Sequence, residues 1–576
     1  MKKTLLLILV SVISFAQTTT TTPFNTKEEG DAFRLWVNQN YPEYANQIKL
    51  GIKGSFTNSY ILKAYEKYGE DYNKLTHTPP KKTNVVSIGK QIDKKMIKQH
   101  VAVLASDAFQ GREVGEPGEE MAAQYIANYF SKIGIPPYKN NTYFQDFNLI
   151  KRKFKNINFE ISGRQYEINK DFFSFPMYSP TIIKSNDILF LGYGIESKKY
   201  NDYQQDVEGR VIMILQGEPK DENGNYILSG SKKKSPKRSW KDKLKTAKKN
   251  KVKAVIFISE NYESDYSTFK HRIEHDALNL LIKEDQIPFF YVNKEITKKV
   301  LGKNKINKFI NKISKTKNTL IKTVNRKISI ATKNNEKIIT GKNVLGYIEG
   351  SDPELKDEII IITAHYDHIG IIDGKVHNGA DDNASGTAGL LEVAAAFQLA
   401  KKLGLEFKRS ILCMPVSAEE KGLLGSYYYA EKPEYPLSQT ITNLNMDMVG
   451  RPDKNHPGNE NYIYVIGSDK LSTDLHNTSE FANSKYVNME LDYTYNEPGD
   501  PNRFYYRSDH YNFAKNNIPS IFYFSGLNED YHKHTDTMEK LSYKKIESLT
   551  KLVFYTAWEL SNAEKRPIVD KINDFD

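Results

Sequence analysis

The chain has 576 residues, 39% of them hydrophobic, and a formal net charge of +11. This length predicts several domains, and the apolar content excludes an intrinsically disordered chain. Twelve basic residues lie between Lys232 and Lys253 against one Asp, and Trp240 is the only aromatic residue there. Because base stacking needs more aromatic residues, we interpret this stretch as a solvated surface and expect no nucleic-acid partner. Attraction to an anionic cell envelope is the intermediate alternative. The single cysteine, Cys413, excludes an intrachain disulfide.

Residues 1–16 have the pattern of a secretory signal peptide. Lys2 and Lys3 precede an apolar stretch, Leu5 to Phe15, which is too short to span a bilayer. Ser14-Phe15-Ala16 carries the small residues that a signal peptidase reads, so we expect cleavage after residue 16. No cysteine follows directly and no later segment is long and apolar. We therefore expect a secreted or periplasmic protein with no lipid anchor and no membrane span; a membrane anchor is the alternative.

Residues 17–90 predict a small helical module followed by a linker. Thr26-Lys27-Glu28-Glu29 fits a capping box, and Phe33 and Trp36 follow at helical spacing. Residues 23–72 loosely resemble short modules attached to bacterial cell-wall enzymes, which implies an association with the cell wall. A prodomain or spacer is the alternative. Residues 73–90 contain Pro-Pro and few apolar residues, which is typical of a linker.

Residues 335–565 predict an α/β domain, and the separate stretch 91–160 predicts helices. Helices are expected at Asp93 to Leu104, Glu119 to Gly134 and Thr387 to Leu403. Apolar strands are expected at 359–362, 411–416, 441–446, 462–466 and 518–524. Strands that alternate with helices indicate a doubly wound, largely parallel sheet flanked by helices. Residues 161–334 predict a β-rich insert without catalytic residues, with strands at 188–190, 211–215 and 255–258.

Acidic residues and histidines follow the predicted strands. They are His365, Asp367, Asp381, Asp382, Glu419, Glu420, Asp447 and His532. In a parallel sheet such residues gather at the carboxyl ends of the strands. Imidazoles and carboxylates without cysteine are typical of an open, catalytic site of zinc type, with room for two ions.

The positions of Asp367, Glu419 and Glu420 suggest different roles for these three acids. Asp367, two positions after His365, can accept the second N–H of that imidazole and fix its tautomer. Glu419 and Glu420 are adjacent, so they point to different sides and one can bind metal while the other acts as a base.

Five motifs in this order resemble the co-catalytic di-zinc exopeptidases, the group of bacterial leucyl aminopeptidase, aminopeptidase Y and glutamate carboxypeptidase. The resemblance covers about 90–150 and 340–560, which implies that 91–160 and 335–565 form one discontinuous domain, and residues 185–330 resemble the protease-associated domain that such enzymes carry as an insert. The motifs are His365-x-Asp367, Gly379 to Gly386 (GADDNASG), Ser417 to Ser426 (SAEEKGLLGS), Asn445-Met446-Asp447 and Asp530-Tyr531-His532 followed by Asp536-Thr537.

The resemblance implies a ligand set for two zinc ions. Asp382 is expected to bridge them. His365 and Asp447 complete one site, and Glu420 and His532 complete the other.

The resemblance also implies the remaining roles. Glu419 is expected to be the general base and Asp367 the residue that orients His365, while Asp381 is expected to be structural. Tyr506 or His510 is a candidate for stabilising the oxyanion. His368 and His534 lie off the pattern, and we interpret both as surface histidines.

The implied function is an exported zinc metallopeptidase. We expect an aminopeptidase that acts on peptide substrates, in which water held by two zinc ions attacks the first peptide bond and Glu419 accepts its proton. A carboxypeptidase, a dipeptidase or a glutaminyl cyclase on the same fold remains an alternative, and a non-catalytic receptor-type ectodomain is a second one.

Overall fold

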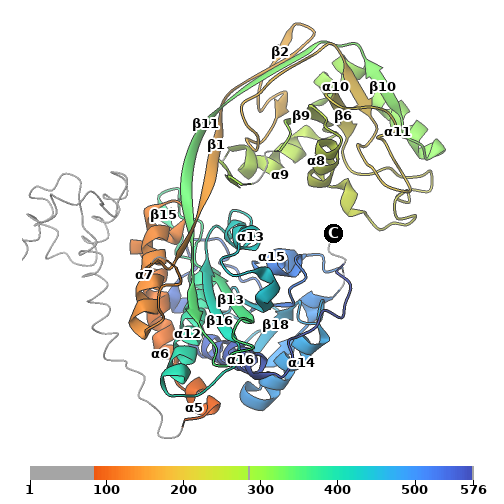
Figure 1. Cartoon of the computed structure of the whole chain (residues 1–576). Helices are drawn as coiled ribbons and strands as arrows, with labels where there is room; N and C mark the ends of the chain where they lie inside the picture. Colours follow the sequence, from red (N-terminus) through yellow and green to blue (C-terminus); the bar gives the residue numbers. More distant parts are fainter. Residues whose placement is uncertain (1–82, 140, 275, 283–285, 498, 574–576) are drawn as a thin grey trace, which may run out of the picture. The chain divides into compact units, whose positions relative to one another are not determined.

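The computed structural model describes residues 83–139, 141–274, 276–282, 286–497 and 499–573. The expected signal peptide and most of the expected helical module lie outside these residues. The described residues before Asn148 and from Thr340 onward form one compact unit, and Asn148–Ile339 form a second (Figure 1). The first unit carries all of the candidate site residues.

The described part of the first unit centres on a seven-stranded sheet. Its strands are β12 Gly346–Ile348, β13 Ile359–His365, β16 Ser410–Val416, β17 Thr440–Met446, β18 Tyr462–Ile466, β19 Glu490–Asp492 and β20 Ser520–Phe524. Their order across the sheet is β12-β16-β13-β17-β20-β18-β19. The central neighbours β16, β13, β17 and β20 run parallel, while β12 and β18 pair antiparallel with β16 and β20. The predicted strands and the largely parallel sheet are confirmed.

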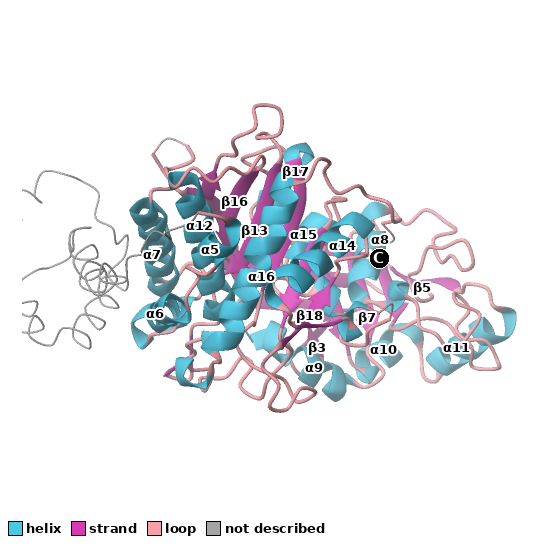
Figure 2. Ribbon diagram, turned by 90° about the horizontal axis from the view of Figure 1, so that it is seen from below, coloured by secondary structure: helices cyan, strands magenta, loops and turns pink. Residues whose placement is uncertain are grey.

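Helices cover both faces of this sheet. They are α5 Val85–Gly89, α6 Lys94–Leu104, α7 Pro117–Ile133, α12 Gly386–Lys402, α13 Leu424–Glu431, α14 Thr473–Ala482, α15 His510–Ala514 and α16 Tyr543–Asn562. In Figure 2, α12 and α16 lie on the same face of the sheet; α12 packs on β13 and β16, and α16 packs on β13. Ile360 of β13 packs in the core that contains α12 and α16, whereas Ile361 packs on the opposite face with Tyr429 of α13 and Phe513 of α15. Burial on both faces explains why these strands are apolar throughout rather than alternating.

Helix α5 lies inside the stretch for which the sequence predicts a linker. Asn84 caps it, because its side chain accepts the backbone N–H of Ser87 at 2.9 Å. Ile88 and Gly89 are buried, and a Cβ on Gly89 would lie 2.2 Å from the hydroxyl oxygen of Tyr555 in α16. Residues 85–89 thus form a helix that is packed within the first unit, rather than an extended linker.

The second unit contains a sheet of order β10-β5-β6-β7-β9-β3, in which β5, β6, β7 and β9 run parallel. These strands are β3 Phe172–Phe173, β5 Ile188–Leu191, β6 Val211–Leu215, β7 Ala254–Ile258, β9 Phe289–Val292 and β10 Ile321–Val324. A second sheet contains β1 Phe144–Ile161, β2 Arg164–Tyr166, β4 Ile182–Ser185, β8 Ala277–Leu280 and β11 Ile328–Val344, of which β1 begins and β11 ends in the first unit. The described residues also form helices α8 Trp240–Lys249, α9 Tyr262–Glu274, α10 Lys294–Leu301 and α11 Lys305–Thr316. The predicted strands are present. The unit also contains helices, which the β-rich pattern of the sequence did not indicate.

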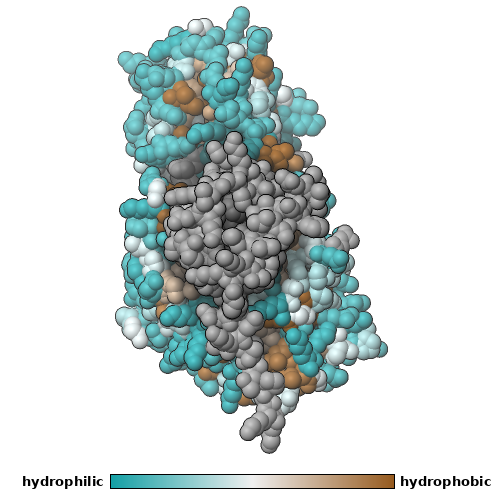
Figure 3. All heavy atoms as spheres, turned by 90° about the vertical axis from the view of Figure 1, so that its left-hand side faces the viewer, coloured by the Kyte–Doolittle hydropathy of each residue, from teal (hydrophilic) through white to brown (hydrophobic). Residues whose placement is uncertain are grey.

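Hydrophilic side chains predominate on the face in Figure 3, where hydrophobic ones appear only in small groups. Within the described ranges, every helix is too short or too polar to cross a lipid bilayer.

Candidate metal centre

The candidate ligands lie at the carboxyl ends of adjacent parallel strands. His365 is the last residue of β13, Asp447 directly follows β17, and Glu419 and Glu420 follow β16. Because β16, β13 and β17 are parallel neighbours, their carboxyl ends meet at one edge of the sheet. His365 and Asp447 therefore come into contact although 82 positions separate them in the sequence.

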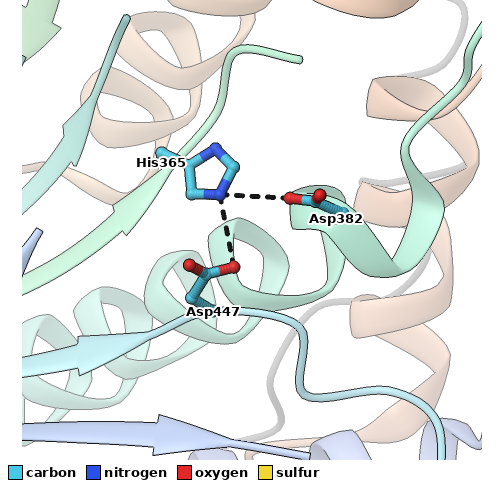
Figure 4. A group of neighbouring side chains, drawn as sticks. All are labelled: His365, Asp382 and Asp447. Atoms are coloured by element: carbon cyan, nitrogen blue, oxygen red, sulfur yellow. Dashed lines mark hydrogen bonds and ion pairs between the residues drawn. The ribbon is translucent and has the colours of Figure 1, made fainter. Parts of the chain in front are cut away.

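His365, Asp382 and Asp447 form the first group of converging side chains. Nε2 of His365 lies 3.2 Å from Oδ1 of Asp382 and 3.2 Å from Oδ1 of Asp447 (Figure 4). All three residues are buried. Nδ1 of His365 lies 3.1 Å from the carbonyl oxygen of Asp367. With its proton on Nδ1 the imidazole donates to this carbonyl, which leaves the Nε2 lone pair facing the two carboxylates.

Asp382 also belongs to a second group, with Glu420, His532 and His368. Its Oδ2 lies 3.2 Å from Nε2 of His532 and 4.0 Å from Nδ1 of His368. Oε2 of Glu420 lies 3.1 Å from the same His532 nitrogen, and Oε1 lies 2.9 Å from Nδ1 of His368. The two oxygens of Asp382 thus face two different groups of side chains.

His368 is not a surface residue, and the interpretation from sequence is wrong on this point. Its side chain is fully buried, since the loop after β13 folds under the turn that carries Asp382. The signal in the sequence was its position three residues after His365 at the same strand end. His534, in contrast, is exposed.

Asp367 makes further contacts besides the one with His365 that the sequence suggests. Its carboxylate lies 3.7 Å from Nδ1 of His365, and its backbone carbonyl lies 3.1 Å from the same nitrogen. The carboxylate accepts the backbone N–H groups of Glu419 at 3.1 Å and Glu420 at 3.4 Å. Burial raises the pKa of Asp367 to about 8. Asp367 thus connects the end of β13 to the loop that carries both glutamates.

Asp536 holds the turn that carries Asp382. Its carboxylate accepts the backbone N–H of Asp381 at 3.0 Å and that of Asp382 at 3.1 Å. Asp381 itself accepts the N–H of Gly450 at 2.7 Å and the amide of Asn528 at 2.8 Å. The sequence motif contained Asp536 but did not indicate this role, because a hydrogen bond over 154 positions leaves no local pattern.

A chain of buried hydrogen bonds orients Asp447. Ser508 donates its hydroxyl to Oδ2 of Asp447 at 2.7 Å. Asn445 donates to Ser508 at 2.8 Å and accepts the hydroxyl of Thr363 at 2.7 Å. Oδ1 of Asp447 is thereby left for the group that contains His365.

Glu419 lies beside both groups without joining either. Its Oε2 is 4.0 Å from Nε2 of His365, and within the described part of the chain its carboxylate makes no hydrogen bond. Burial raises the pKa of Glu419 well above its usual value, and neighbouring Glu420 adds to this.

A small hollow of about 30 Å³ is lined on its acidic side by Asp382, Glu419, Glu420, Asp447 and His532. Its other lining residues are Met448, Phe504, Arg507, Phe522, Phe524, Leu527 and Tyr531. The hollow therefore combines an acidic end with a largely apolar wall. Tyr506 and His510, the candidates for stabilising an oxyanion, are not among the lining residues. The His510 ring is fully buried and stacks on Phe522, and burial lowers its pKa to about 3.

The charges of the site match the binding of cations. Burial favours the neutral form of Asp382, but the imidazoles of His365 and His532 outweigh it and hold the pKa of this carboxyl well below its usual value. Burial alone would lower the pKa of His532, but the carboxylates of Asp382 and Glu420 raise it to about 10. The carboxylates thus require nearby positive charge, which protonated imidazoles or divalent cations can supply.

The family model for peptidase family M28 matches residues 343–557. This part of the chain is thus similar to peptidase family M28. The matched residues contain all of the groups described above, from His365 to Asp536.

Several curated proteins are similar to part of this chain. Aminopeptidase YwaD of Bacillus subtilis (strain 168) is 28% identical over 235 residues, which are 40% of this chain and 46% of that protein. A probable leucine aminopeptidase of Arthroderma otae is 30% identical over 218 residues, which are 37% of this chain and 56% of that protein. The chain thus spans about half the length of these relatives.

Among solved structures, the aminopeptidase from Aneurinibacillus sp. strain AM-1 aligns over 85% of this chain and 99% of its own. Its TM-score is 0.49 and its sequence identity 19%. BSAP, a zinc aminopeptidase from Bacillus subtilis, aligns over 84% and 99%, with a TM-score of 0.42 and 20% identity.

Proposed function

We propose that this protein is a zinc-dependent aminopeptidase that hydrolyses N-terminal peptide bonds at a centre for two zinc ions. The observation that carries the proposal is the geometry around Asp382, whose two oxygens lie 3.2 Å from His365 and 3.2 Å from His532. Its relatives include proteins named as aminopeptidases.

The donor atoms fit two zinc ions. His365 and Asp447 would hold one ion together with Asp382, and Glu420 and His532 would hold the other. Nε2 of His532 is shielded from solvent and makes no hydrogen bond with the residues that the structure describes, although two carboxylate oxygens lie within 3.2 Å of it. Nitrogen and oxygen donors without cysteine are typical of open catalytic sites. When bound, zinc would supply a Lewis acid that polarises the substrate carbonyl and lowers the pKa of water.

Glu419 is the proposed general base. Its carboxylate lies next to the ligands but is engaged by no hydrogen bond from the described residues. It accepts a proton from the attacking water and returns the proton to the leaving amine.

Tyr531 supplies a hydroxyl donor in the hollow. Its ring stacks on His532 with 3.8 Å between ring centroids, and it lines the hollow. Burial raises the pKa of Tyr531, so the phenol keeps its proton and can donate to the oxygen of the scissile carbonyl.

The hollow favours a substrate with an apolar first residue. Phe504, Phe522 and Leu527 offer an apolar wall to the side chain of that residue.

Arg507 favours a carboxypeptidase or dipeptidase as the second candidate. It lines the hollow and donates to the hydroxyl of Tyr531 at 3.3 Å. Among the described residues, no carboxylate pairs with it. A guanidinium in this position can bind the carboxylate of a C-terminal residue.

Three forms of one leucine-initiated peptide separate these functions: the free peptide, its N-acetyl form and its C-terminal amide. We expect release of leucine from the free peptide and the amide, and none from the acetylated form. Cleavage of the acetylated peptide together with an intact amide would establish a carboxypeptidase instead. Metal analysis should find about two zinc ions per chain, and removing them with a chelator should abolish hydrolysis until zinc is returned.

We also infer that the protein is exported, from the basic start and apolar stretch of residues 1–16. Fractionation of the producing cells tests this, and a cytosolic protein that retains these residues would contradict it.

A further inference from the structure

Residues 110–112, which precede α7, pack closely against the loops of the candidate metal centre that contain Gly370 and His377. Three consecutive residues, Gln110, Gly111 and Arg112, have left-handed backbone angles, with φ of 50°, 68° and 51°. A Cβ on Gly111 would lie 2.4 Å from the carbonyl oxygen of His377 and 2.5 Å from that of Gly370. Only glycine fits there, because it combines the positive φ with the close approach of two backbones.

Backbone hydrogen bonds attach this segment to the loop after β13. His368 donates its N–H to the carbonyl of Arg112 at 3.1 Å, and Gly370 donates to the carbonyl of Gly111 at 3.0 Å. Gly111 and Arg112 therefore contact the loop that also contains Asp367.

The guanidinium of Arg112 joins the two segments that carry His365 and Asp382. The Arg112 side chain is fully buried. Its Nε donates to the carbonyl of Tyr366 at 2.6 Å, and Tyr366 directly follows His365. Nη2 donates to the carbonyl of Gly379, three residues before Asp382, at 2.9 Å. Nη1 donates to the carbonyls of Asn378, at 2.7 Å, and Leu104.

Among the described residues, carbonyl oxygens are thus the only hydrogen-bond partners of this cation, and no carboxylate forms an ion pair with it. Its charge nevertheless acts on the site. Burial lowers the pKa of Arg112 to about 10, while the carboxylates of Asp367 and Asp382 favour its charged form. The guanidinium therefore remains charged at neutral pH and offsets repulsion among the buried acids.

We propose that Arg112 is a positioning residue for the metal centre, which fixes the spacing between His365 and Asp382 and so sets the affinity for the metal ions. This inference rests on the proposed function. A planar group with five N–H donors can hold several carbonyls in one geometry, which a flexible ammonium cannot.

Arg409 provides a matched control in the same unit. It is also buried, and its guanidinium donates to the carbonyls of Leu560 at 3.3 Å and Ala563 at 2.5 Å. It pairs with Glu358 at 2.6 Å and contacts none of the candidate ligands. Replacing it disturbs the packing of a buried arginine but leaves the metal centre intact.

The test compares the full-length protein with its Arg112→Met, Arg112→Lys and Arg409→Met variants. Each is stripped of metal and titrated with Zn²⁺ against a chromophoric chelator, and then with Co²⁺, whose visible spectrum reports the coordination. The melting temperature of each metal-free protein is measured in parallel. We expect Arg112→Met to bind zinc about 10- to 100-fold more weakly, with an altered Co²⁺ spectrum. Arg112→Lys should be intermediate, and Arg409→Met should lose melting temperature while keeping the affinity of the unsubstituted protein.

Unchanged affinity and spectrum in both Arg112 variants would overturn the inference, as would an equal loss of affinity in Arg409→Met. If Arg112→Met does not fold, Arg112→Lys decides the question by the same measurements. If the unsubstituted protein binds no zinc, the proposed function fails and this inference fails with it.

Discussion

The adjacent glutamates Glu419 and Glu420 offer a sharp test of the proposed chemistry, because they differ in role but not in chemical type. Glu419→Gln removes the proposed base. Its carboxylate makes no hydrogen bond to the described residues, so the amide breaks no such contact. Glu420→Gln removes a proposed ligand, whose oxygens lie 2.9 Å from Nδ1 of His368 and 3.1 Å from Nε2 of His532.

The expected size of each effect follows from these contacts. A positioned general base contributes about 10²- to 10⁴-fold to the rate, which corresponds to about 3–5 kcal/mol of activation free energy. We therefore expect Glu419→Gln to lower kcat by about this factor while KM and zinc content stay nearly unchanged. Glu420→Gln should instead lose zinc, because an amide is a weaker ligand than a carboxylate and cannot balance the charge.

The assay measures kcat and KM on a free leucine-initiated peptide, with the zinc content of the same samples. Excess zinc added to both variants serves as the control, since it should restore activity in part for Glu420→Gln and not for Glu419→Gln. A Glu419→Gln variant with kcat within tenfold of the unsubstituted enzyme and both zinc ions bound would refute the assignment of the base.

Three further perturbations test the surrounding structure. Asp382→Ala should lose both zinc ions together, and two retained ions per chain in metal analysis would exclude the bridge. Ser508→Ala removes the 2.7 Å hydrogen bond to Asp447 and should weaken zinc binding about 10- to 100-fold in a chelator competition; unchanged affinity would contradict this. Burial raises the pKa of Glu119 from 4.5 to about 7, so the folded state binds more protons and stability falls as pH rises through this range. In urea unfolding of metal-free protein, the stability difference between Glu119→Gln and the unsubstituted protein should shift by about 3 kcal/mol between pH 4 and pH 8, and a constant difference would disprove this effect of burial.

Much of the fold could be predicted from local patterns. Apolar runs such as Ile359 to Ile362 predicted strands, because a strand buried on both faces carries no polar alternation. The strand that ends before Asp447 and the helix that begins near Gly386 were predicted in the same way. Helix α5 was missed because five residues are too few for a periodic signal, and its stability comes from packing against Tyr555.

The candidate ligands could also be proposed from sequence, because acids and histidines at strand ends stand out against apolar strands. Their partners could not. His368 looked like a surface residue until the loop after β13 placed it beside Glu420. Asp367 was expected to orient His365, and its carboxylate does lie 3.7 Å from that imidazole, but no pattern indicated that it also accepts the backbone N–H of Glu419.

The sequence by itself thus determined where acids and histidines follow apolar strands, because these properties depend on residue type and short-range periodicity. Only the tertiary structure decided how they are held. Asp536 and Arg112 act on backbone groups 154 and 254 positions away, respectively. Such hydrogen bonds depend on how distant loops pack, and any residue in those loops presents the same N–H and carbonyl, so the sequence carries no mark of them.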